Sequence, residues 1–410
     1  MSEWKKYKLS EIGAVVGGAT PSTSVEKYYG GDIPWLTPKD LSNFNDRFIE
    51  HGERNITQAG LDSCSAQLLP AGSVLFSSRA PIGYVAIAKN PIATNQGFKS
   101  VIPNTEIVDS MFLYYLLVYN KDNIEALGSG TTFKEVSGAT MKNVEVCLPP
   151  MEEQKRIAGI LSALDDKIEL NRRINANLEL QAQTLFNHWF VDFEFPNTDG
   201  KPYKSSGGKL IDSPLGPIPE DWKVGDYTDI INIKGGGTPK TGIAEYWNGN
   251  IPFFSPKDVP ASCYVLNTEK YITDTGLQNC SSALYPKNTV FITARGTVGK
   301  VVMAGRDMAM NQTNYALIGK NGIGQYFVYN ITLQLVKRLL KKANGAVFNA
   351  ITTRDFSSEQ IVIPQETIIK YFCNKVAPIY EQVLINNCEN ENLSKLLDTL
   401  LPKLISNQLK

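Results

Sequence analysis

Two long stretches of the chain carry apolar residues at spacings that alternate between four and three. The first stretch follows Pro149-Pro150 and the second follows Pro364. This repeat predicts two helices, each with one apolar seam that pairs with another helix in a coiled coil. The first seam comprises Ile157, Leu161, Leu164, Ile168, Asn171, Asn175, Leu178, Ala182, Leu185 and Trp189. The second seam comprises Phe372, Val376, Ile379, Val383, Asn386, Asn390, Leu393, Leu397, Leu400 and Leu404.

Both seams carry asparagine at the same two central positions, Asn171 and Asn175 in the first and Asn386 and Asn390 in the second. They are either tolerated polar residues facing solvent or register residues, because a buried asparagine needs a polar partner and penalises slipped pairing. Central placement brings them together in parallel or antiparallel pairing. We favour antiparallel pairing, which gives a pseudo-two-fold axis and sends the preceding globular parts to opposite ends. A helix of about 33 residues is roughly 50 Å long.

The segments that precede the two helices alternate short apolar runs with glycine, proline and asparagine turns. Strands are predicted near Gly72–Phe76 and Thr289–Ile292, and helices over Ser110–Tyr119 and Tyr326–Lys342. The pattern predicts an α+β fold with two tandem globular domains. Each domain is mixed α/β, rich in loops and followed by a long helix.

The second half of the chain repeats the first. The offset is 218 residues near the start of each copy, then 216, then 215, so the copies differ only by small loop deletions. The pairs include Trp4 with Trp222, Lys39 with Lys257, Arg79 with Arg295, Asn95-Gln96 with Asn311-Gln312, Gly130 with Gly345 and Pro149 with Pro364. The predicted organisation is a domain over residues 1–150, a helix over 151–195, a linker over 196–218, a domain over 219–365 and a helix over 366–410.

Composition and charge are those of an ordinary globular protein, with 42% hydrophobic residues and 41 basic against 41 acidic side chains. Residues 1–150 hold 13 basic and 15 acidic residues, whereas residues 196–365 hold 18 and 13. Bulk charge therefore cannot supply all the attraction to a nucleic acid. The six scattered cysteines and the absence of a secretion signal indicate reduced, mostly buried thiols in the cytoplasm.

Motifs of catalysis are absent from the sequence. The string Gly296–Val301 has neither the spacing nor the hydroxyl of a phosphate-binding loop. No motif of an amino-methyltransferase occurs, and neither His51 nor His188 has partners for a catalytic triad or a metal site. The acidic pairs Glu152-Glu153 and Asp165-Asp166 are expected on the solvated side of the first helix. The chain is therefore predicted to be non-catalytic.

A series of motifs resembles one known family. In order they are G-G-A-T-P, Y-Y-G-G-D-I-P-W, P-K-D-L, I-T-Q-A-G-L, N-Q-G-F, G-S-G-T-T-F-K and L-P-P-M-E-E-Q-K-R-I-A, with G-P-I-P-E-D-W and L-L-P-K-L-I in the second copy. This order resembles the specificity (S) subunit of type I restriction–modification systems over essentially the whole chain. The resemblance implies two target recognition domains, each followed by a spacer helix. Each domain would read one half of an asymmetric split DNA site, and the coiled coil would set the gap.

The resemblance also implies partners and cofactors. Two methyltransferase subunits would bring S-adenosylmethionine chemistry, and motor-nuclease subunits would add cleavage that uses ATP and Mg²⁺, whereas this chain would carry no cofactor of its own. Partner docking is expected at Glu152, Glu153 and Gln154, which open the first helix. The second helix opens with Gln365-Glu366-Thr367 and lacks this run. If the run helps to dock the partner, the two docking sites differ in strength, but both are expected to work because the second seam is intact.

The repeat also sorts the residues that would contact double-stranded DNA. Phosphate contacts can be the same in both domains, whereas base contacts must differ if the half-sites differ. The shared positions, expected to contact phosphates or to shape loops, are Lys39, Arg79, Asn95, Gln96, Lys257, Arg295, Asn311 and Gln312. The differing or loop positions, expected to read bases, are Thr131, Thr132, Lys134, Asn314 and Asn349. A loop-stabilising hydrogen bond is the alternative role for each.

A coiled-coil scaffold that binds only proteins remains the alternative function. It accounts for the apolar seams and the neutral charge. It does not account for two large domains with polar loops, each duplicated together with its helix.

Overall fold

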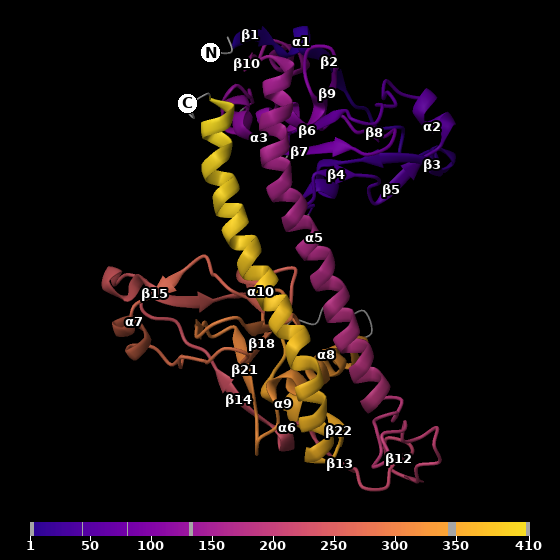
Figure 1. Ribbon diagram of the computed structural model, residues 1–410, viewed down its shortest axis with the longest axis vertical. Coiled ribbons are helices and arrows are strands. Elements are labelled where there is room, and N and C mark those ends of the chain that lie inside the picture. The colour runs from indigo at the N-terminus through magenta and orange to yellow at the C-terminus, as the bar shows by residue number, and fades with distance from the viewer. Residues whose placement is uncertain (1–3, 43, 80, 131–133, 343–349, 407–410) are drawn as a thin grey trace. The chain divides into compact units, whose positions relative to one another are not determined.

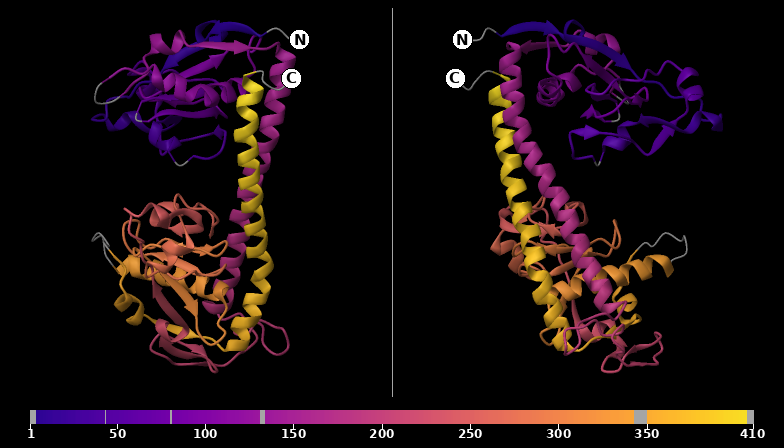
Figure 2. Two further views of the ribbon diagram at one scale, coloured as in Figure 1. Left: turned by 90° about the vertical axis from the view of Figure 1, so that its left-hand side faces the viewer. Right: turned by 45° about the vertical axis from the view of Figure 1, so that its right-hand side comes forward.

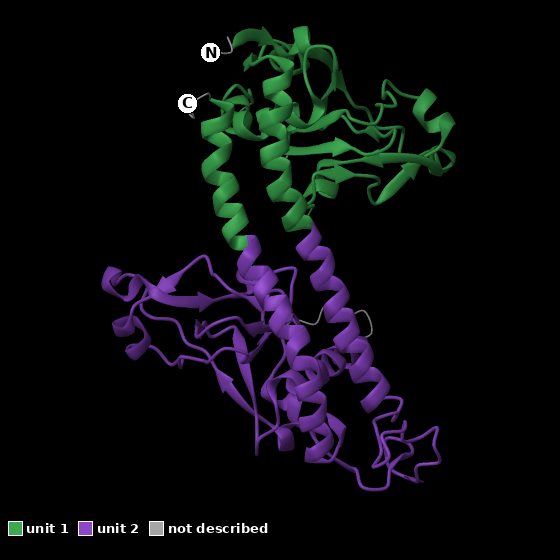
Figure 3. Ribbon diagram, viewed as in Figure 1, with its two compact units in different colours: residues 1–169, 391–410 green, residues 170–390 purple. Residues whose placement is uncertain are grey.

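The computed structural model describes residues 4–42, 44–79, 81–130, 134–342 and 350–406. The chain divides into two compact units (Figure 3). Unit 1 contains residues 1–169 and 391–410, and unit 2 contains residues 170–390. The two long helices, α5 (Met151–Phe190) and α10 (Glu366–Ile405), each contribute residues to both units. The units are described separately below.

The domain of unit 1 contains short strands joined by turns and small helices, as the turn-rich sequence predicts. Its elements are β1 (Lys5–Lys8), α1 (Leu9–Ile12), β2 (Gly13–Gly17), η1 (Glu26–Tyr28), β3 (Tyr29–Leu36), η2 (Pro38–Leu41), β4 (Phe48–Ile49), β5 (Arg54–Ile56), α2 (Gln58–Asp62), β6 (Val74–Ser78), β7 (Ile82–Ala88), β8 (Ala93–Thr94), β9 (Lys99–Pro103), α3 (Ser110–Ala126), α4 (Gly138–Lys142) and β10 (Glu145–Leu148).

The domain of unit 2 follows the same order after a connector. The connector contains the paired strands β11 (Leu210–Ile211) and β12 (Ile218–Pro219). The elements of the domain are β13 (Lys223–Asp226), α6 (Tyr227–Ile230), β14 (Ile231–Gly235), η3 (Ala244–Tyr246), β15 (Trp247–Phe254), η4 (Pro256–Asp258), β16 (Tyr264–Val265), β17 (Tyr271–Ile272), α7 (Asp274–Gln278), β18 (Val290–Thr293), β19 (Val301–Ala304), β20 (Ala309–Met310), β21 (Asn314–Gly319), α8 (Gln325–Lys342), α9 (Thr353–Ser357) and β22 (Gln360–Ile363). The connector is a structured segment, in which Phe195 stacks on Tyr203 and Trp222 at centroid distances of 4.6 and 4.8 Å.

The strand orders of the two domains match element by element. Unit 1 has a five-stranded sheet in the order β2-β9-β6-β7-β4, a three-stranded sheet β5-β3-β8 and the pair β1-β10. Unit 2 has β14-β21-β18-β19-β16, β17-β15-β20 and β13-β22. In Figure 1 the three-stranded sheet of unit 1 lies farther from α5 than the five-stranded sheet does. The repeat in the sequence is therefore a repeat of the fold, mixed α/β in both copies as predicted.

Shared motifs mainly build this fold. Thr57 and Thr273 cap α2 and α7, each accepting a hydrogen bond from the backbone N–H three residues later at 3.1 and 3.0 Å. Glycine at those later positions is required because a Cβ at Gly60 would lie 2.4 Å from the Tyr28 carbonyl oxygen, and one at Gly276 2.3 Å from that of Tyr246. The I-T-x-x-G-L motif therefore forms a short helix that is capped by its threonine and packs against the backbone through its glycine.

Each long helix has 40 residues, more than the 33 spanned by its apolar seam and fewer than the 45 of its predicted range. Their seam residues complete the core of each unit. In unit 1, Ile157 and Leu161 of α5 and Leu404 of α10 join the cluster of buried residues around Phe76 and Phe112. In unit 2, Trp189 of α5 and Phe372 of α10 join the cluster that contains residues of α8. Within unit 2 the two helices lie side by side, as both views of Figure 2 show.

Helix α3 begins where the sequence predicts and ends later. Asp109 caps it by accepting a hydrogen bond from the Phe112 backbone N–H at 2.9 Å. The helix continues seven residues beyond Tyr119, to Ala126, because the polar residues of its last turns face solvent while Ile124 stays buried. No helix in the described part of the chain is long and apolar enough to span a membrane.

Candidate DNA interface

A cleft of about 610 Å³ opens in the domain of unit 2, and four of the predicted DNA-contacting residues line it. They are Lys257, Arg295, Asn311 and Gln312. The first and last of these residues, Lys257 and Gln312, are 55 positions apart in the sequence. Only the comparison of the two copies predicted that they act together. Trp247, Lys270 and several threonines complete the polar lining of the cleft.

Local backbone structure places each of these side chains. Lys257 lies in η4, whose start is fixed by Asp258, since the Asp258 carboxylate accepts hydrogen bonds from the Ser255 N–H at 2.8 Å and the Ser255 hydroxyl at 2.6 Å. Arg295 follows β18 and pairs with Ala350 in an antiparallel bridge. Gln312 lies between β20 and β21 and accepts a hydrogen bond from the Thr238 hydroxyl.

The cleft carries more positive than negative charge. Its lining includes the cations of Lys257, Lys270 and Arg295 and one carboxylate, Glu269. Lys270 lies over the Trp247 ring with its Nζ 5.6 Å from the centroid. Across the residues that the structure describes, none of the three cations forms an ion pair. The cleft therefore offers unneutralised donors, hydroxyls and an aromatic face.

The equivalent cations of unit 1 are neutralised by carboxylates. Lys39 pairs with Glu53 at 2.9 Å, and the Arg79 guanidinium lies 3.7 Å from the Glu135 carboxylate. Lys99 also pairs with Glu135, at 3.4 Å. Glu135 occupies the position of Ala350 in the second copy, because the antiparallel bridge of Arg79 with Glu135 matches that of Arg295 with Ala350. The two domains thus share a frame and differ in ion pairing at the same surface.

The family model for the "type I restriction modification DNA specificity domain" matches residues 1–180 and 219–407. The chain belongs to the type I restriction–modification specificity subunits. It is 35% identical to the specificity subunit of the type I restriction enzyme MjaIX of Methanocaldococcus jannaschii, over 100% of this chain and 94% of that protein. It is 24% identical to the HindI specificity subunit of Haemophilus influenzae, over 100% of both chains.

A solved structure gives the same fold. The S subunit of a type I restriction–modification system from M. genitalium matches with a TM-score of 0.57 and 16% identity, covering 98% of this chain and 96% of that one. A specificity subunit determines DNA sequence recognition within a larger complex, so the resemblance stated from the motifs is confirmed.

The four seam asparagines of this specificity subunit bond to one another within unit 2, and all but Asn390 are buried. The Asn386 amide donates to the Asn175 side-chain oxygen at 2.8 Å, and the Asn171 amide donates to that of Asn390 at 2.9 Å. Asn171, Asn175 and Asn386 are at most 5% exposed. The numbers of the partners run in opposite directions, so the helices are antiparallel here. A role in fixing the register remains a prediction.

Several predicted DNA contacts of the subunit are structural residues. Asn314 is fully buried and its amide donates to Asn311 at 2.7 Å, so the prediction that it reads bases is wrong. Its side chain points into the domain because β21 begins at this residue. Asn95 and Asn311 shape their loops, accepting hydrogen bonds from the backbone N–H two residues later at 2.8 and 3.0 Å. Gln96 is exposed and bonded to Thr20.

Some predicted contacts lie elsewhere or outside the described residues. Lys134 is exposed at the end of its loop. Thr131, Thr132 and Asn349 lie outside the described residues.

The predicted docking residues at the start of α5 have different environments. Gln154 is 1% exposed, donating to the Ile107 and Pro149 carbonyls at 3.0 and 2.9 Å and accepting from the Asp109 N–H at 3.0 Å. It ties α5 to its own domain, so the prediction that it docks a partner is wrong. Glu152 is exposed, and Glu153 forms a two-bonded ion pair with Arg156 at 2.6 and 2.7 Å. Docking at these two glutamates remains a prediction.

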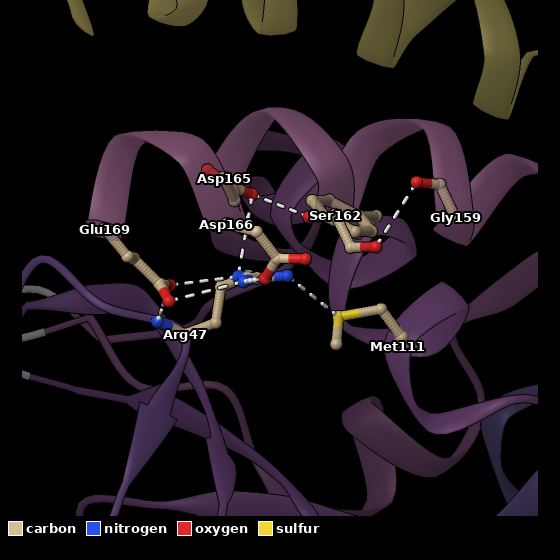
Figure 4. A network of polar contacts seen from close by, with 8 residues as sticks. Arg47, Met111, Gly159, Ser162, Asp165, Asp166 and Glu169 are labelled. Atoms are coloured by element: carbon tan, nitrogen blue, oxygen red, sulfur yellow. Dashed lines mark hydrogen bonds and ion pairs between the residues drawn. The ribbon is translucent and has the colours of Figure 1, made fainter. Parts of the chain in front are cut away.

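A buried arginine, Arg47, joins the first domain to α5, and the sequence did not predict this role. Arg47 is 2% exposed and its backbone and side chain both donate to Glu169 at 3.0 Å (Figure 4). It also bonds Asp166 and lies 4.0 Å from Asp165, which accepts from the Tyr115 hydroxyl at 2.6 Å. The expectation of a solvated position is therefore wrong for Asp165, which is 17% exposed, whereas Asp166 is exposed as expected and still bonds Arg47.

Burial works against the charged form of Arg47, but the hydrogen bonds to Glu169 and Asp166 outweigh it and raise the pKa of the guanidinium. Burial, with the charge of Asp165, raises the pKa of Tyr115. The Arg47 guanidinium therefore stays charged, and the Tyr115 hydroxyl stays protonated and able to donate to Asp165. A charged residue just before β4 was the only sequence signal for this network.

The cysteines were predicted to be mostly buried, and this is wrong. Cys263 is buried, whereas Cys147 and Cys388 are exposed and Cys64, Cys280 and Cys373 are intermediate. Cys147 is exposed because alternate residues of β10 face outward. No cluster of three possible metal ligands occurs among the residues that the structure describes.

Proposed function

We propose that this specificity subunit recognises a bipartite, asymmetric DNA site and directs methyltransferase and restriction subunits to it. Each domain reads one half-site, and the two long helices set the distance between the halves. The subunit itself catalyses no reaction and acts in the cytoplasm.

One observation supports this proposal. The cleft of the second domain is lined by amides, hydroxyls and exposed cations, and these cations form no ion pair among the described residues. Arginine and lysine donate to phosphates and to guanine, and amides and hydroxyls contact base edges. The lining includes one residue type of each class, in Arg295, Gln312 and Thr313. Such a surface suits the edge of a DNA groove.

An asymmetric site follows from the differences between the copies. The region equivalent to the cleft carries Glu135 in unit 1 and Ala350 in unit 2, beside the shared Arg79 and Arg295. Two surfaces with the same frame but different side chains select different bases, so the half-sites differ in sequence.

The helices support the proposed role in spacing. A helix of 40 residues is about 60 Å long at 1.5 Å per residue, compared with about 34–36 Å for one turn of DNA. The asparagine side chains bond to each other across the seam only in a matching register, which favours a single alignment of the helices. A fixed alignment gives a fixed gap.

The proposed partners carry the chemistry. Two methyltransferase subunits would supply S-adenosylmethionine chemistry, and motor-nuclease subunits would use ATP and Mg²⁺. Glu152 and Glu153 offer an acidic face at the start of α5, and Ile369 occupies in α10 the position of the buried Gln154 in α5. The two helix starts therefore differ, which supports docking sites of unequal strength.

A binding experiment tests the proposal. The full chain, alone and together with the methyltransferase subunit from its genome, is incubated with a random-sequence DNA pool and shifted complexes are sequenced. We expect enrichment of a split motif, and we expect Arg295→Glu to abolish it. Lys287→Glu, an equally exposed residue of unit 2 outside the cleft, is the control. A chain that binds the methyltransferase but never DNA would be a scaffold instead.

A further inference from the structure

We propose that Glu135 makes the half-site of the first domain specific for a cytosine, because its carboxylate accepts a hydrogen bond from the cytosine N4 amino group. This inference rests on the proposed function and assigns one base to one residue. Nothing in the sequence comparison of shared and differing positions had singled out Glu135.

The backbone around Glu135 is fixed on both sides. The Ser129 N–H donates to the Glu135 carbonyl at 3.0 Å and the Glu135 N–H donates to the Ser129 carbonyl at 2.9 Å, which closes a short loop. The next residue is tied to the sheet, since the Val136 N–H donates to the Ser78 carbonyl at 3.0 Å. Glu135 therefore stands at the base of its loop, in a position that does not depend on the loop tip.

The carboxylate is also oriented. One oxygen lies 3.7 Å from Arg79 and the other 3.4 Å from Lys99, while the side chain remains 41% exposed. Lys99 is only 14% exposed, so it holds the carboxylate from the inner side. An ionised carboxylate has about four acceptor positions, which leaves capacity for a donor from outside. The group is an acceptor held in place and presented to solvent.

This acceptor lies on the surface that matches the cleft of the second domain. Lys99 Nζ is 3.4 Å from the carbonyl oxygen of Gln96, and Gln96 corresponds to Gln312 of the cleft. Arg79 corresponds to Arg295 of the cleft. If the second domain contacts DNA through the cleft, Glu135 faces the same groove in the first.

Base chemistry then selects cytosine. In the major groove guanine presents only acceptors, and thymine presents an acceptor and a methyl group. Neither base has a donor there that could bond a carboxylate. Adenine presents an amino group beside the N7 acceptor, which repels the second oxygen. Cytosine presents its N4 amino group without a neighbouring acceptor on the same base. A carboxylate is therefore best matched by cytosine.

The second domain provides an internal comparison. Ala350 stands where Glu135 does and has no acceptor on its side chain, so the second half-site has no cytosine preference from this position. A purely electrostatic role makes a different prediction. If Glu135 only neutralises Arg79 and Lys99, its removal strengthens phosphate attraction equally for all sequences.

The test is sequence selection from a random DNA pool by the full chain in complex with its methyltransferase, with Glu135→Ala, Glu135→Gln and the exposed control Glu106→Gln. We expect Glu135→Ala to lose discrimination at one base pair of one half-site by about 5- to 150-fold. Glu135→Gln should move the preference at that base pair from cytosine towards adenine, because an amide both donates and accepts. The other half-site and the control should be unchanged.

Two results separate the inference from the function beneath it. Tighter binding of every sequence by Glu135→Ala, with an unaltered motif, would overturn the assignment of Glu135 and leave the split motif standing. A wild-type complex that selects no motif would overturn the proposed function itself. Glu135→Gln keeps the size of the side chain, so it still tests whether Glu135 selects cytosine if Glu135→Ala does not fold.

Discussion

The two domains contact the long helices at equivalent backbone positions, but the side chains there are charged in one domain and apolar or aromatic in the other. We call the contact of Arg47 with the carboxylates of Asp165, Asp166 and Glu169 in α5 the charged junction. Cys263 stands at the equivalent place in unit 2. The equivalence is shown by the backbone, because the Arg47 and Cys263 carbonyls accept hydrogen bonds of 2.7 Å from β7 and β19 respectively. The fold thus fixes the position but not its chemistry.

The partners of this position differ in the same way. Asp165 of the charged junction corresponds to Tyr380, which is fully buried, stacks on Tyr326 at 4.9 Å and accepts a hydrogen bond from Asn330 at 2.8 Å. Glu169 corresponds to Leu384, which is also buried. We call this second site the aromatic junction. The first copy is held by ion pairs. The second combines packed rings with the Cys263 N–H and the Ser262 hydroxyl, which donate to Glu179 of α5 at 3.0 Å each, so the two should respond differently to substitution.

The largest expected effect comes from breaking the charged junction. Arg47→Met leaves Asp165 and Glu169, which are 17% and 15% exposed, close together without their cation. Removing one partner of a buried ion pair costs about 3–5 kcal/mol, so we expect the free energy of unfolding of unit 1 to fall by about 3 kcal/mol. Chemical denaturation of the full chain, with hydrogen exchange to locate the loss in the first half of α5, measures it.

The matched control is Cys263→Ala at the aromatic junction, which removes one small apolar group and no charge. It should leave hydrogen exchange in unit 1 unchanged. A fall of less than about 1 kcal/mol for Arg47→Met, the range of exposed ion pairs, would mean that the carboxylates are solvated and the junction is not charge-dependent.

The second expected effect concerns the two DNA surfaces. Arg295 forms no ion pair within the described residues, whereas Arg79 shares Glu135 with Lys99. Arg295→Ala should therefore lower the slope of log affinity against log salt concentration by about 1, as expected for a lost phosphate contact. Arg79→Ala should change that slope less. Equal changes for the two variants would show that the ion pairs of unit 1 open on binding.

The smallest expected effect is at the aromatic junction. Tyr380→Phe removes one hydroxyl from a buried ring and keeps its stacking on Tyr326. The loss of a single hydrogen bond costs about 1 kcal/mol, and Asn330 keeps its bond to the Tyr326 carbonyl at 2.8 Å. Thermal unfolding of the full chain measures it. A loss as large as that of Arg47→Met would mean that both junctions depend on polar contacts.

The frame of the molecule could be predicted from sequence because its signals are local or repeated. Seam residues recur every three or four positions, and Ile157, Leu161 and Phe372 are buried as the pattern predicts. The repeat also grouped Lys257, Arg295 and Gln312, which share one cleft. The end of α3 was less predictable, because its polar last turns carry no apolar period.

The charged contacts could not be predicted, because they join residues far apart in sequence. Arg47 and Glu169 are separated by 122 positions, and nothing in either neighbourhood requires the other. Asn314 was misassigned for the opposite reason, since a polar side chain at the start of a strand gives no sign of being buried. Glu135 and Ala350 are equivalent at an offset of 215, so extending the comparison of the two copies to this position would have revealed the difference between them.

The central claim, that the domains read DNA and the helices set the gap, is tested most directly by mapping the methylated motif after inserting seven residues into both helices. The insertions are placed beside Asn171 and Asn390, which contact each other, so that the two helices lengthen together. Seven residues add about 10 Å, roughly three base pairs of DNA. We predict a gap longer by about that amount between unchanged half-sites. An unchanged gap, or altered half-sites, would contradict the account.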